Sequence, residues 1–381
     1  MVIRISNQKT MLSNKKITVL GAGMVGRTIA RELAKQHLVT SIDFSTENLR
    51  RLAEKDGTIT CIHANLSQAD TNFHDLLSDA DLVISAVPGF LGYQVLEQII
   101  LCGKNVVDIS FFPESIGPLH QLAIEKNVTA VMDCGVAPGM SNLILGQFIH
   151  KMEVTEFVFY VGGLPILREP PFEYKAPFSP IDVIEEYTRP ARLRKAGKAI
   201  TLPALSEREL IHFEELGELE GFNTDGLRSL LDSYPNIPDM SEKTLRYPGH
   251  AQLIETLLSI GFFKEEHLAA TAKVLLESWL QKEDDQDVTA MKVIVRGVQN
   301  QHPITIEYSL IDYYDEQQKL SSMSRTTGYT CCAMAEWMLQ GVISKKGVFP
   351  PEIMGEDDAL FGYIIQYLQQ RNVNWKKKVY Q

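Results

Sequence analysis

The sequence is poor in cysteine and has no long apolar stretch. Its five cysteines are an odd number without CxxC spacing, so neither a disulfide framework nor a zinc knuckle is expected, and a reducing cytoplasm fits. No apolar run approaches the roughly 20 residues that span a bilayer. The first 16 residues lack the continuous apolar region of a signal peptide. The nine histidines form neither HxxEH nor HxxxH, so no metal site is expected.

An excess of basic charge is also missing. The chain carries 37 lysine and arginine residues against 48 acidic ones, which gives a net charge of -11. This balance argues against nucleic acid or an anionic membrane as the main partner. With 45% hydrophobic and 22% charged residues, the 381-residue chain has the composition of a globular protein of two or three domains.

Strand and helix patterns alternate in the first third of the chain. The strands are almost entirely apolar, which is typical of a parallel sheet that helices cover on both faces. The pattern therefore predicts an α/β domain with a Rossmann-type doubly wound sheet. The expected strands are Lys16–Leu20, Leu38–Asp43, Thr58–His63, Asp81–Val87, Lys104–Ser110 and Val128–Asp133.

The pattern changes after about Ala137. Long strands are expected at Glu156–Gly163, Val288–Gly297 and Pro303–Tyr314, and the last of these alternates between apolar and polar residues. Such alternation indicates a sheet with one face on a core and the other nearer water. We therefore expect an α+β domain with a largely antiparallel sheet, followed by a solvated lysine-rich tail at Lys376–Lys378.

A glycine motif follows the first expected strand. The run Gly21–Gly26 (GAGMVG) matches GxGxxG and opens a helix, which is the context of a dinucleotide site. Gly21 permits the tight turn, Gly23 lets the backbone approach a pyrophosphate, and Gly26 lets the helix pack closely on the sheet.

Asp43 closes the second strand, 22 residues after Gly21. Its carboxylate can accept hydrogen bonds from ribose hydroxyls and would repel a 2′-phosphate, and no arginine is adjacent. NAD is therefore preferred over NADP. Further contacts are expected at the carboxyl ends of the strands, although Asp108 could instead cap its own loop. The predicted cofactor residues are Gly21, Ala22, Gly23, Met24, Val25, Gly26, Asp43, Phe44, Asn65, Leu66, Ala86, Val87, Pro88, Asp108, Ile109, Ser110, Cys134 and Gly135.

Several longer motifs carry a family resemblance. They are DCGVAPGMSN at 133–142, YVGGLP at 160–165, EPPFEYK at 169–175, LRYPGH at 245–250, RTTGYT at 325–330 and GVISKKGVFPPE at 341–352. With them the chain resembles the saccharopine dehydrogenase family, and in particular its short L-lysine 6-dehydrogenase branch. The sequence departs from that branch at residues 223–226, where NTDG replaces the usual HTSG, and at Cys134. The first departure puts the identity of the substrate in question more than the type of reaction.

The resemblance implies an oxidoreductase of amino-acid metabolism. It also implies that the chain is divided into two domains and forms a dimer. The NAD-binding Rossmann domain would comprise residues 1–137 and about 325–381, since the C-terminal segment returns to it. Residues 138–324 would form the substrate-binding and dimerisation domain of a cytoplasmic homodimer. The reaction would remove hydride from the ε-carbon of L-lysine, a step of lysine catabolism. The resulting imine would hydrolyse to allysine, which cyclises to Δ1-piperideine-6-carboxylate.

An amine gives up hydride only when its nitrogen is neutral, and a free ε-ammonium has a pKa of about 10.4. The site therefore needs a base or a group that depresses this pKa. Asp133 is one candidate, with the alternative that it holds the following glycine loop. His250 is the other, with the alternatives of a carboxylate anchor or a core histidine. Arg246 is expected to bind the substrate carboxylate, with the alternative that it forms a structural ion pair. The other predicted substrate contacts are Tyr247, Tyr174, Thr224 and Tyr93.

Two other functions stay open at this point. A saccharopine or carboxynorspermidine-type dehydrogenase would act on a secondary amine with two or more carboxylates, and it would need additional basic residues. Arg189, Arg192 and Arg194 could supply them. A non-catalytic NAD-binding sensor would keep the glycine motif and Asp43 but would have no need for the motifs of the second half.

Overall fold

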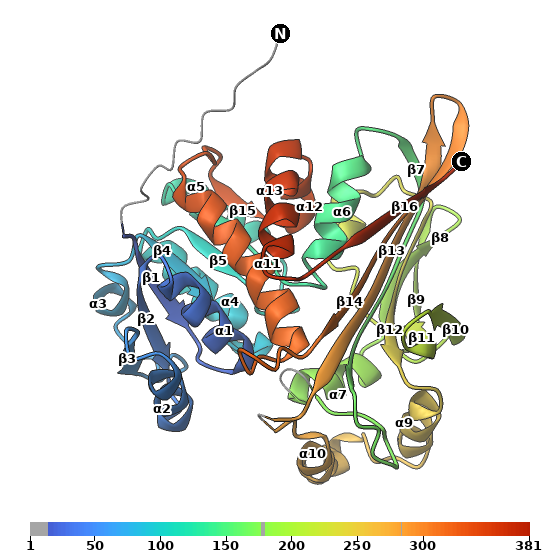
Figure 1. Cartoon of the computed structure of the whole chain (residues 1–381), viewed down its shortest axis with the longest axis horizontal. Helices are drawn as coiled ribbons and strands as arrows, with labels where there is room; N and C mark the ends of the chain where they lie inside the picture. Colours follow the sequence, from blue (N-terminus) through green and yellow to red (C-terminus); the bar gives the residue numbers. More distant parts are fainter. Residues whose placement is uncertain (1–13, 177–179, 283) are drawn as a thin grey trace.

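The computed structural model describes residues 14–176, 180–282 and 284–381. Residues 1–13, for which the sequence predicts no signal peptide, lie outside this part. The expected parallel sheet is confirmed. Its seven strands are β1 (Lys16–Leu20), β2 (Leu38–Asp43), β3 (Thr60–His63), β4 (Leu82–Ser85), β5 (Val106–Asp108), β6 (Thr129–Val131) and β15 (Gly347–Phe349). They lie in the order β15-β6-β5-β4-β1-β2-β3 (Figure 1).

Helices cover both faces of this sheet, because its strands are apolar on both sides. Ile17 and Val19 of β1 point into one core and Leu20 into the other. The first core also contains α1 (Met24–Ala34), α2 (Thr46–Lys55) and α11 (Ser322–Leu339). The second contains α3 (Phe73–Leu77), α4 (Gly89–Leu101) and α5 (Gly117–Glu125). The architecture is the predicted doubly wound Rossmann-type domain.

The second sheet has nine strands and is largely antiparallel, as predicted, with one parallel pairing. They are β7 (Glu153–Pro165), β8 (Ala191–Lys195), β9 (Lys198–Leu202), β10 (Glu209–Phe213), β11 (Gly217–Asn223), β12 (Asp239–Arg246), β13 (Asp287–Gln299), β14 (His302–Tyr313) and β16 (Lys376–Tyr380). Central strand β7 pairs with β12 in parallel and with β13 antiparallel. The lysine-rich tail is exposed to solvent as predicted, but it forms a strand, because β16 pairs with β14 along its whole length.

The remaining helices join the two sheets or cover the second one. They are α6 (Met140–Phe148), α7 (Pro180–Thr188), α8 (Leu230–Ser233), α9 (His250–Ser259), α10 (Glu265–Trp279), α12 (Pro351–Gly355) and α13 (Asp358–Gln369). One apolar core runs from the first sheet through α6, α11 and α13 to the inner face of the second (Figure 1). A separate core joins α7, α9 and α10. Among the described helices, none has both the length and the apolar character needed to cross a bilayer.

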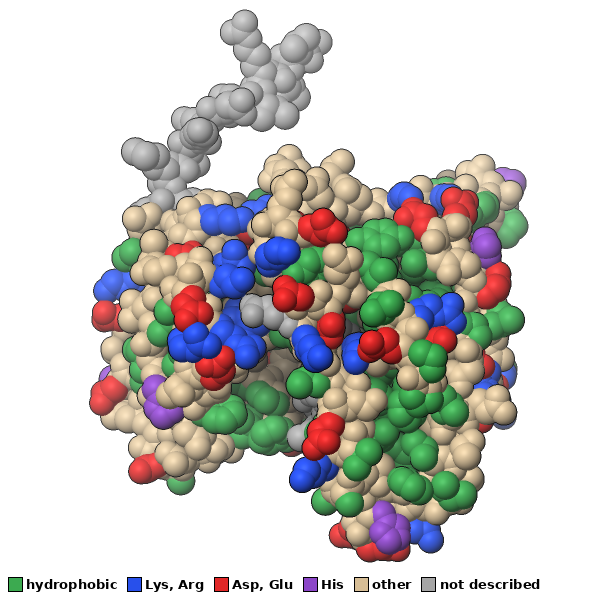
Figure 2. Space-filling view, turned by 60° about the horizontal axis from the view of Figure 1, so that its bottom comes forward, with side chains coloured by type: hydrophobic (Ala, Val, Ile, Leu, Met, Phe, Trp, Pro, Cys, Tyr) green, Lys and Arg blue, Asp and Glu red, His purple; other side chains and the backbone are tan. Residues whose placement is uncertain are grey.

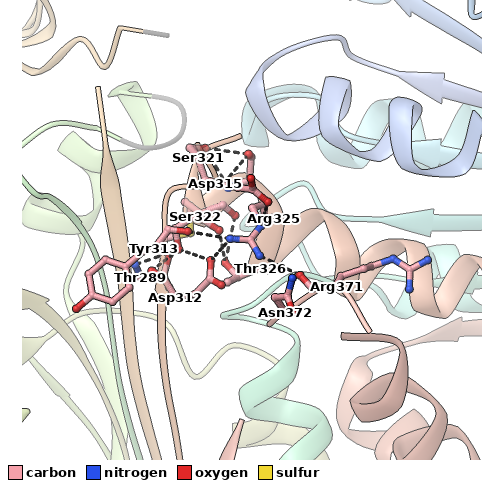
Figure 3. A network of polar contacts seen from close by, with 12 residues as sticks. Thr289, Asp312, Tyr313, Asp315, Ser321, Ser322, Arg325, Thr326, Arg371 and Asn372 are labelled. Carbon is pink, nitrogen blue, oxygen red and sulfur yellow. Dashed lines mark hydrogen bonds and ion pairs between the residues drawn. The ribbon is translucent and has the colours of Figure 1, made fainter. Parts of the chain in front are cut away.

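A buried polar network attaches α11 to the second sheet (Figure 3). Asp287 of β13 accepts hydrogen bonds from the backbone N–H groups of Ser322 and Met323, at 2.7 and 3.1 Å. Arg325 donates to the Asp312 carboxylate of β14 at 3.3 Å and to the backbone oxygen of Arg371 at 2.9 Å. Helix α11 therefore packs on the first sheet while its N-terminus is held by the second.

The chain after about residue 325 thus contributes to both sheets. Helix α11 and strand β15 return to the first sheet, whereas β16 extends the second. The division at residues 137 and 325 stays a prediction.

Candidate functional site

A cavity of about 670 Å³ lies where the two halves of the chain meet. From the first half it is lined by the glycine-rich turn and by the ends of β4 and β5, and from the second half by β7, β12 and α7. Helix α11 adds Met323 and Thr327. Figure 2 shows a hollow between the two halves, with basic and acidic side chains around its edge. The volume is within the range of small-molecule sites.

The glycine-rich turn has the geometry that the motif predicts. Gly21 has a φ of +100°, and a Cβ there would stand 2.4 Å from the backbone oxygen of Ala86. A Cβ on Gly26 would stand 2.1 Å from the oxygen of Gly21, so only glycine allows α1 to approach the turn. A Cβ on Gly23 would meet nothing within 4 Å, because Gly23 faces the cavity.

The N-terminus of α1 is suited to an anion. No side chain caps it, and Gly23, Met24, Val25 and Gly26 all line the cavity. The first backbone N–H groups of a helix have no partner within the helix, and they carry a partial positive charge. The open space at Gly23 and the uncapped N-terminus therefore fit a dinucleotide pyrophosphate.

Replacing Gly23 with alanine should weaken nucleotide binding and leave the stability of the fold nearly unchanged. Its φ is -63°, which alanine adopts readily, so we expect the free energy of unfolding to change by less than about 1 kcal/mol. The new methyl group would occupy the space where the pyrophosphate approaches, so nucleotide Kd should rise about tenfold or more. Calorimetry measures both quantities. Gly26→Ala is the control and should destabilise the fold itself, whereas an unchanged Kd in Gly23→Ala would place the pyrophosphate elsewhere.

Asp43 lies beside the turn, but both of its carboxylate oxygens have backbone partners. Oδ2 accepts from the N–H of Ala22 and Oδ1 from that of Ser45, each at 2.6 Å. Asp43 thus fixes the turn and does not itself line the cavity. Three polar residues do line the cavity near the turn, and these are Arg27, Asn48 and Arg51. The sequence interpretation had not included these three.

The other predicted cofactor residues fall into two groups. Six of those at strand ends line the cavity, which are Ala86, Val87, Pro88, Ile109, Ser110 and Gly135. Phe44 is 66% exposed, Leu66 and Cys134 are buried in the core, and the Asn65 side chain accepts hydrogen bonds from Ser67. None of these four lines the cavity.

Asp108 is fully buried at the end of β5 and caps its loop. Its carboxylate accepts from the N–H of Ser110 at 2.9 Å and from the hydroxyl at 2.7 Å. Burial raises the pKa of Asp108 to about 7, and the nearby Asp133 carboxylate contributes to this increase. The residue thus shapes the wall that Ser110 presents to the cavity.

Asp133 is held by an arginine that the sequence interpretation had not identified. Its two oxygens accept from Nε and Nη2 of Arg228 at 2.8 and 3.0 Å, and its side chain has 0% exposure. Arg228 also donates to the backbone oxygen of Phe112 and stacks on Phe111, whose ring centroid lies 4.2 Å away. Because Phe111 lines the cavity and Asp133 does not, this arrangement favours the structural alternative for Asp133.

His250 is likewise outside the cavity wall. Its Nδ1 lies 2.9 Å from the backbone oxygen of Phe172, which can only accept, so Nδ1 carries the proton. Nε2 then accepts from the Tyr187 hydroxyl at 2.9 Å. Burial lowers the pKa of His250 to about 3, so the ring is neutral at physiological pH. His250 orients Tyr187, whose hydroxyl oxygen accepts in turn from Arg246 Nε at 3.0 Å.

Arg246 reaches the cavity from β12 and is fixed on several sides. Nη1 donates to the backbone oxygen of Leu245 at 2.9 Å, and Nη2 donates to Glu186 at 3.0 Å. The guanidinium lies 4.4 Å above the ring of Tyr174. Only 3% of the residue is exposed, so the charge is held in place at the cavity wall.

The other predicted substrate residues have different positions. Thr224 lines the cavity, whereas Tyr174 lies behind Arg246. The Tyr247 hydroxyl donates to the backbone oxygen of Pro165 at 2.9 Å, and Tyr93 packs edge-to-face on Phe112. Neither of these two tyrosines lines the cavity.

Glu242 of β12 is a cavity residue that the sequence interpretation missed. Its Oε2 accepts from the hydroxyl of Thr224 at 2.5 Å and from the N–H of Gly226 at 3.1 Å. A Cβ on Gly226 would stand 2.6 Å from the Glu242 carboxyl carbon, so glycine is needed there. Burial raises the pKa of Glu242 to about 8. The available signal was its spacing from Arg246, since residues four apart in a strand share a face.

The NTDG segment also has a clear structural role. Asp225 forms a two-pronged ion pair with Arg192, at 2.9 Å for each of two contacts. Arg192 is one of the three arginines that could serve a larger substrate, and its guanidinium is already paired with Asp225. Arg194 donates to the backbone of Gly197, and of the three only Arg189 lines the cavity. Within the described part of the chain, no group of three or more metal-ligating side chains is present.

Comparison with known proteins supports the same organisation. The model of the saccharopine dehydrogenase NADP binding domain matches residues 17–131, and that of the saccharopine dehydrogenase C-terminal domain matches residues 135–373. The structure resembles a saccharopine dehydrogenase (L-Glu forming) from Saccharomyces cerevisiae with a TM-score of 0.80, at 19% identity over 97% of this chain and 100% of that one.

The curated relatives that match this chain differ from it in length. An alpha-aminoadipic semialdehyde synthase from Rattus norvegicus is 23% identical over 68% of this chain, which spans only 29% of that protein. A saccharopine dehydrogenase [NADP(+), L-glutamate-forming] from Pyricularia oryzae is 22% identical over 86% of this chain and 77% of its own length. Together with the two domain models, which cover most of the sequence, these matches establish that the chain belongs to the saccharopine dehydrogenase family.

Proposed function

We propose that the protein is a nicotinamide-dependent dehydrogenase that oxidises an amine-bearing carbon of an amino acid, with the ε-carbon of L-lysine as the first candidate. The observation that carries this proposal is the cavity that joins the glycine-rich turn to Arg246 and Glu242. A nucleotide at the turn and an amino acid at β12 would share one enclosed space, which is what direct hydride transfer requires.

The chain's own residues supply binding and orientation. The N-terminus of α1 would hold the pyrophosphate, where the nicotinamide cofactor contributes the hydride acceptor. Arg246 is positioned to bind a carboxylate, because its charge is fixed and buried at the wall. Glu242 at the same end, once ionised, would favour a cationic amine, whereas Glu186 is paired with Arg246. The substrate would thus lie with its carboxylate at Arg246 and its amine toward Glu242.

A second candidate is saccharopine, a secondary amine with more than one carboxylate. Arg189, directly after α7, lines the cavity, which offers a second cation besides Arg246 at this end, although it is paired with Glu185. Two of the matched relatives also carry the name saccharopine dehydrogenase. A carboxynorspermidine-type substrate would likewise need additional basic residues in the site.

For the cofactor we propose NAD first and NADP second. Asp43 does not line the cavity and its oxygens are bound by backbone N–H groups, but its negative charge at the end of β2 would disfavour a 2′-phosphate nearby. Arg27 and Arg51 line the cavity near the turn and favour NADP, as does the name of the matching domain model. The homodimer and the cytoplasmic location stay predictions.

The test is a matrix of two cofactors and several amines. Purified full-length protein would be mixed with NAD or NADP and with L-lysine, saccharopine or cadaverine, and reduced nicotinamide would be followed by its absorbance. We expect reduction with NAD and lysine and formation of Δ1-piperideine-6-carboxylate. Cadaverine is lysine without its carboxylate, so it should react poorly if Arg246 anchors that group.

Other outcomes discriminate among the alternatives. Reduction with saccharopine but not with lysine, together with release of glutamate, would favour the second candidate. Binding of nucleotide by calorimetry without turnover of any amine would favour a non-catalytic sensor and would overturn the proposal.

A further inference from the structure

Strand β12 presents three polar side chains to the cavity. Glu242, Thr244 and Arg246 all line it, because alternate residues of a strand point to the same face. The residues between them point away, since Lys243 donates to the backbone oxygen of Glu207 and Leu245 lies in the core on the opposite face. Glu242 and Arg246 are four residues apart, which corresponds to roughly 13 Å along the strand. One strand thus carries a carboxyl group and a guanidinium at separate points of the same wall.

The Glu242 carboxyl group is held by only one of its oxygens. Oε2 receives the hydrogen bonds of Thr224 and Gly226. Within the described residues, no side chain or backbone N–H donates to Oε1. The residue is 4% exposed and borders the cavity, so Oε1 is available to a molecule that enters.

Among the described residues, no lysine or arginine side chain forms an ion pair with Glu242. Glu186 approaches from α7 and is paired with Arg246, and Asp225 from the segment after β11 is paired with Arg192. Both carboxylates disfavour the ionised form of Glu242, which adds to the larger effect of burial. The hydrogen bond from Thr224 acts in the opposite direction. Glu242 therefore differs from Asp225 and Glu186, whose charges are balanced by arginines.

We infer that Glu242 Oε1 accepts the proton from the substrate nitrogen during amine oxidation. This inference rests on the proposed function. A proton moves from the substrate ammonium to Oε1, so that an N–H bond breaks and an O–H bond forms. The electron pair left on nitrogen then forms the C=N bond as hydride leaves the adjacent carbon for the nicotinamide. Water adds to the resulting iminium, which releases ammonia from a primary amine or a second amine from a secondary one.

The acidity of Glu242 suits this role better than that of an ordinary glutamate. A free glutamic acid has a pKa of about 4.3, far below the roughly 10.4 of an ε-ammonium. A pKa of about 8 reduces the difference in pKa between the ammonium that donates and the carboxylate that accepts, which favours proton transfer near neutral pH. Only the ionised carboxylate can accept the proton. The rate should therefore increase as the pH rises through about 8.

The test compares Glu242→Gln with Asp239→Asn. Asp239 lies on the same strand, three residues before Glu242, so its position belongs to the opposite face, and it does not line the cavity. It therefore controls for the loss of one carboxylate. We expect kcat/KM to fall about 100-fold or more in Glu242→Gln and its rise near pH 8 to disappear, with Asp239→Asn like the wild type. A Glu242→Gln variant that keeps both the rate and the pH profile would overturn the inference while leaving the proposed function intact.

A second measurement does not depend on turnover. Infrared difference spectroscopy of the nucleotide-free protein should detect a protonated carboxyl group that ionises near pH 8 and is missing from Glu242→Gln. If the wild type shows this titration but oxidises no amine, the proposed function fails, and the role of Glu242 fails with it. If the wild type is active but lacks the titration, the inference alone is overturned.

Thr224→Val provides an independent variant if Glu242→Gln does not fold. Removal of the hydroxyl eliminates a hydrogen bond to the ionised carboxylate, so the pKa of Glu242 should increase. The midpoint of the kcat/KM profile should then move to higher pH. An unchanged midpoint in an active Thr224→Val protein would count against Glu242.

Discussion

Replacing Arg228 with methionine is expected to lower the free energy of unfolding by about 3–5 kcal/mol, because it leaves the Asp133 carboxylate buried without a partner. The side chains of Asp133 and Arg228 are 0% and 8% exposed, and two hydrogen bonds join them. Arg228 also ties the loop after β5 to the loop after β6 through its bond to Phe112. Chemical denaturation measures the loss.

Two controls isolate the buried charge as the cause. The double variant Arg228→Met with Asp133→Asn removes that charge and should recover part of the lost stability. Arg192→Met removes an equally well-formed pair, but the Arg192 side chain is 54% exposed, so it should cost only about 1 kcal/mol or less. Equal losses in Arg228→Met and Arg192→Met would show that burial does not set the cost.

Changing Arg246 to lysine should reduce kcat/KM for an amino-acid substrate by about 100-fold or more. Truncation of a buried, hydrogen-bonded charge at a binding site costs about 2–5 kcal/mol, and about 1.4 kcal/mol corresponds to a factor of ten. Lysine keeps the charge, but its three N–H donors sit on one nitrogen, so it lacks the planar spread of Nε, Nη1 and Nη2 with which Arg246 reaches Tyr187, Leu245 and Glu186. Steady-state kinetics with L-lysine and with saccharopine measure the effect.

Cadaverine supplies the matched control for Arg246. If the guanidinium binds the substrate carboxylate, the variant and the wild type should process this carboxylate-free amine at similar rates. A loss of the same size with cadaverine would mean that Arg246 acts by holding the cavity wall. The two substrates thus separate carboxylate binding from support of the fold.

The nucleotide-binding half was predictable because its signals are local. The apolar strands and the spacing from Gly21 to Asp43 follow from short stretches of sequence, and β2 has the bounds that the pattern predicts. Strand β15 was missed because it has only three residues and joins the sheet far from the other strands in sequence.

The candidate site was harder to predict because its groups acquire their roles from distant partners. Asp133 is paired with a residue 95 positions away, and His250 with one 63 positions away. Neither pairing leaves a trace in the local sequence. Glu242 was missed for a related reason, because Asp239–Arg246 (DMSEKTLR) lacks the apolar and polar alternation that marks a strand. Its environment depends on Thr224 and Gly226, which lie on a different segment.

The return of the chain to the first sheet has a consequence for folding during synthesis. Strand β6 pairs with β15, and the Thr129 hydroxyl donates to a backbone oxygen 216 residues further along. N-terminal domains generally fold as they leave the ribosome, and contacts between distant residues form slowly. The nucleotide-binding half therefore cannot close its sheet until most of the chain has been made. By then the strands of the second sheet are present as well, so both walls of the cavity should form together.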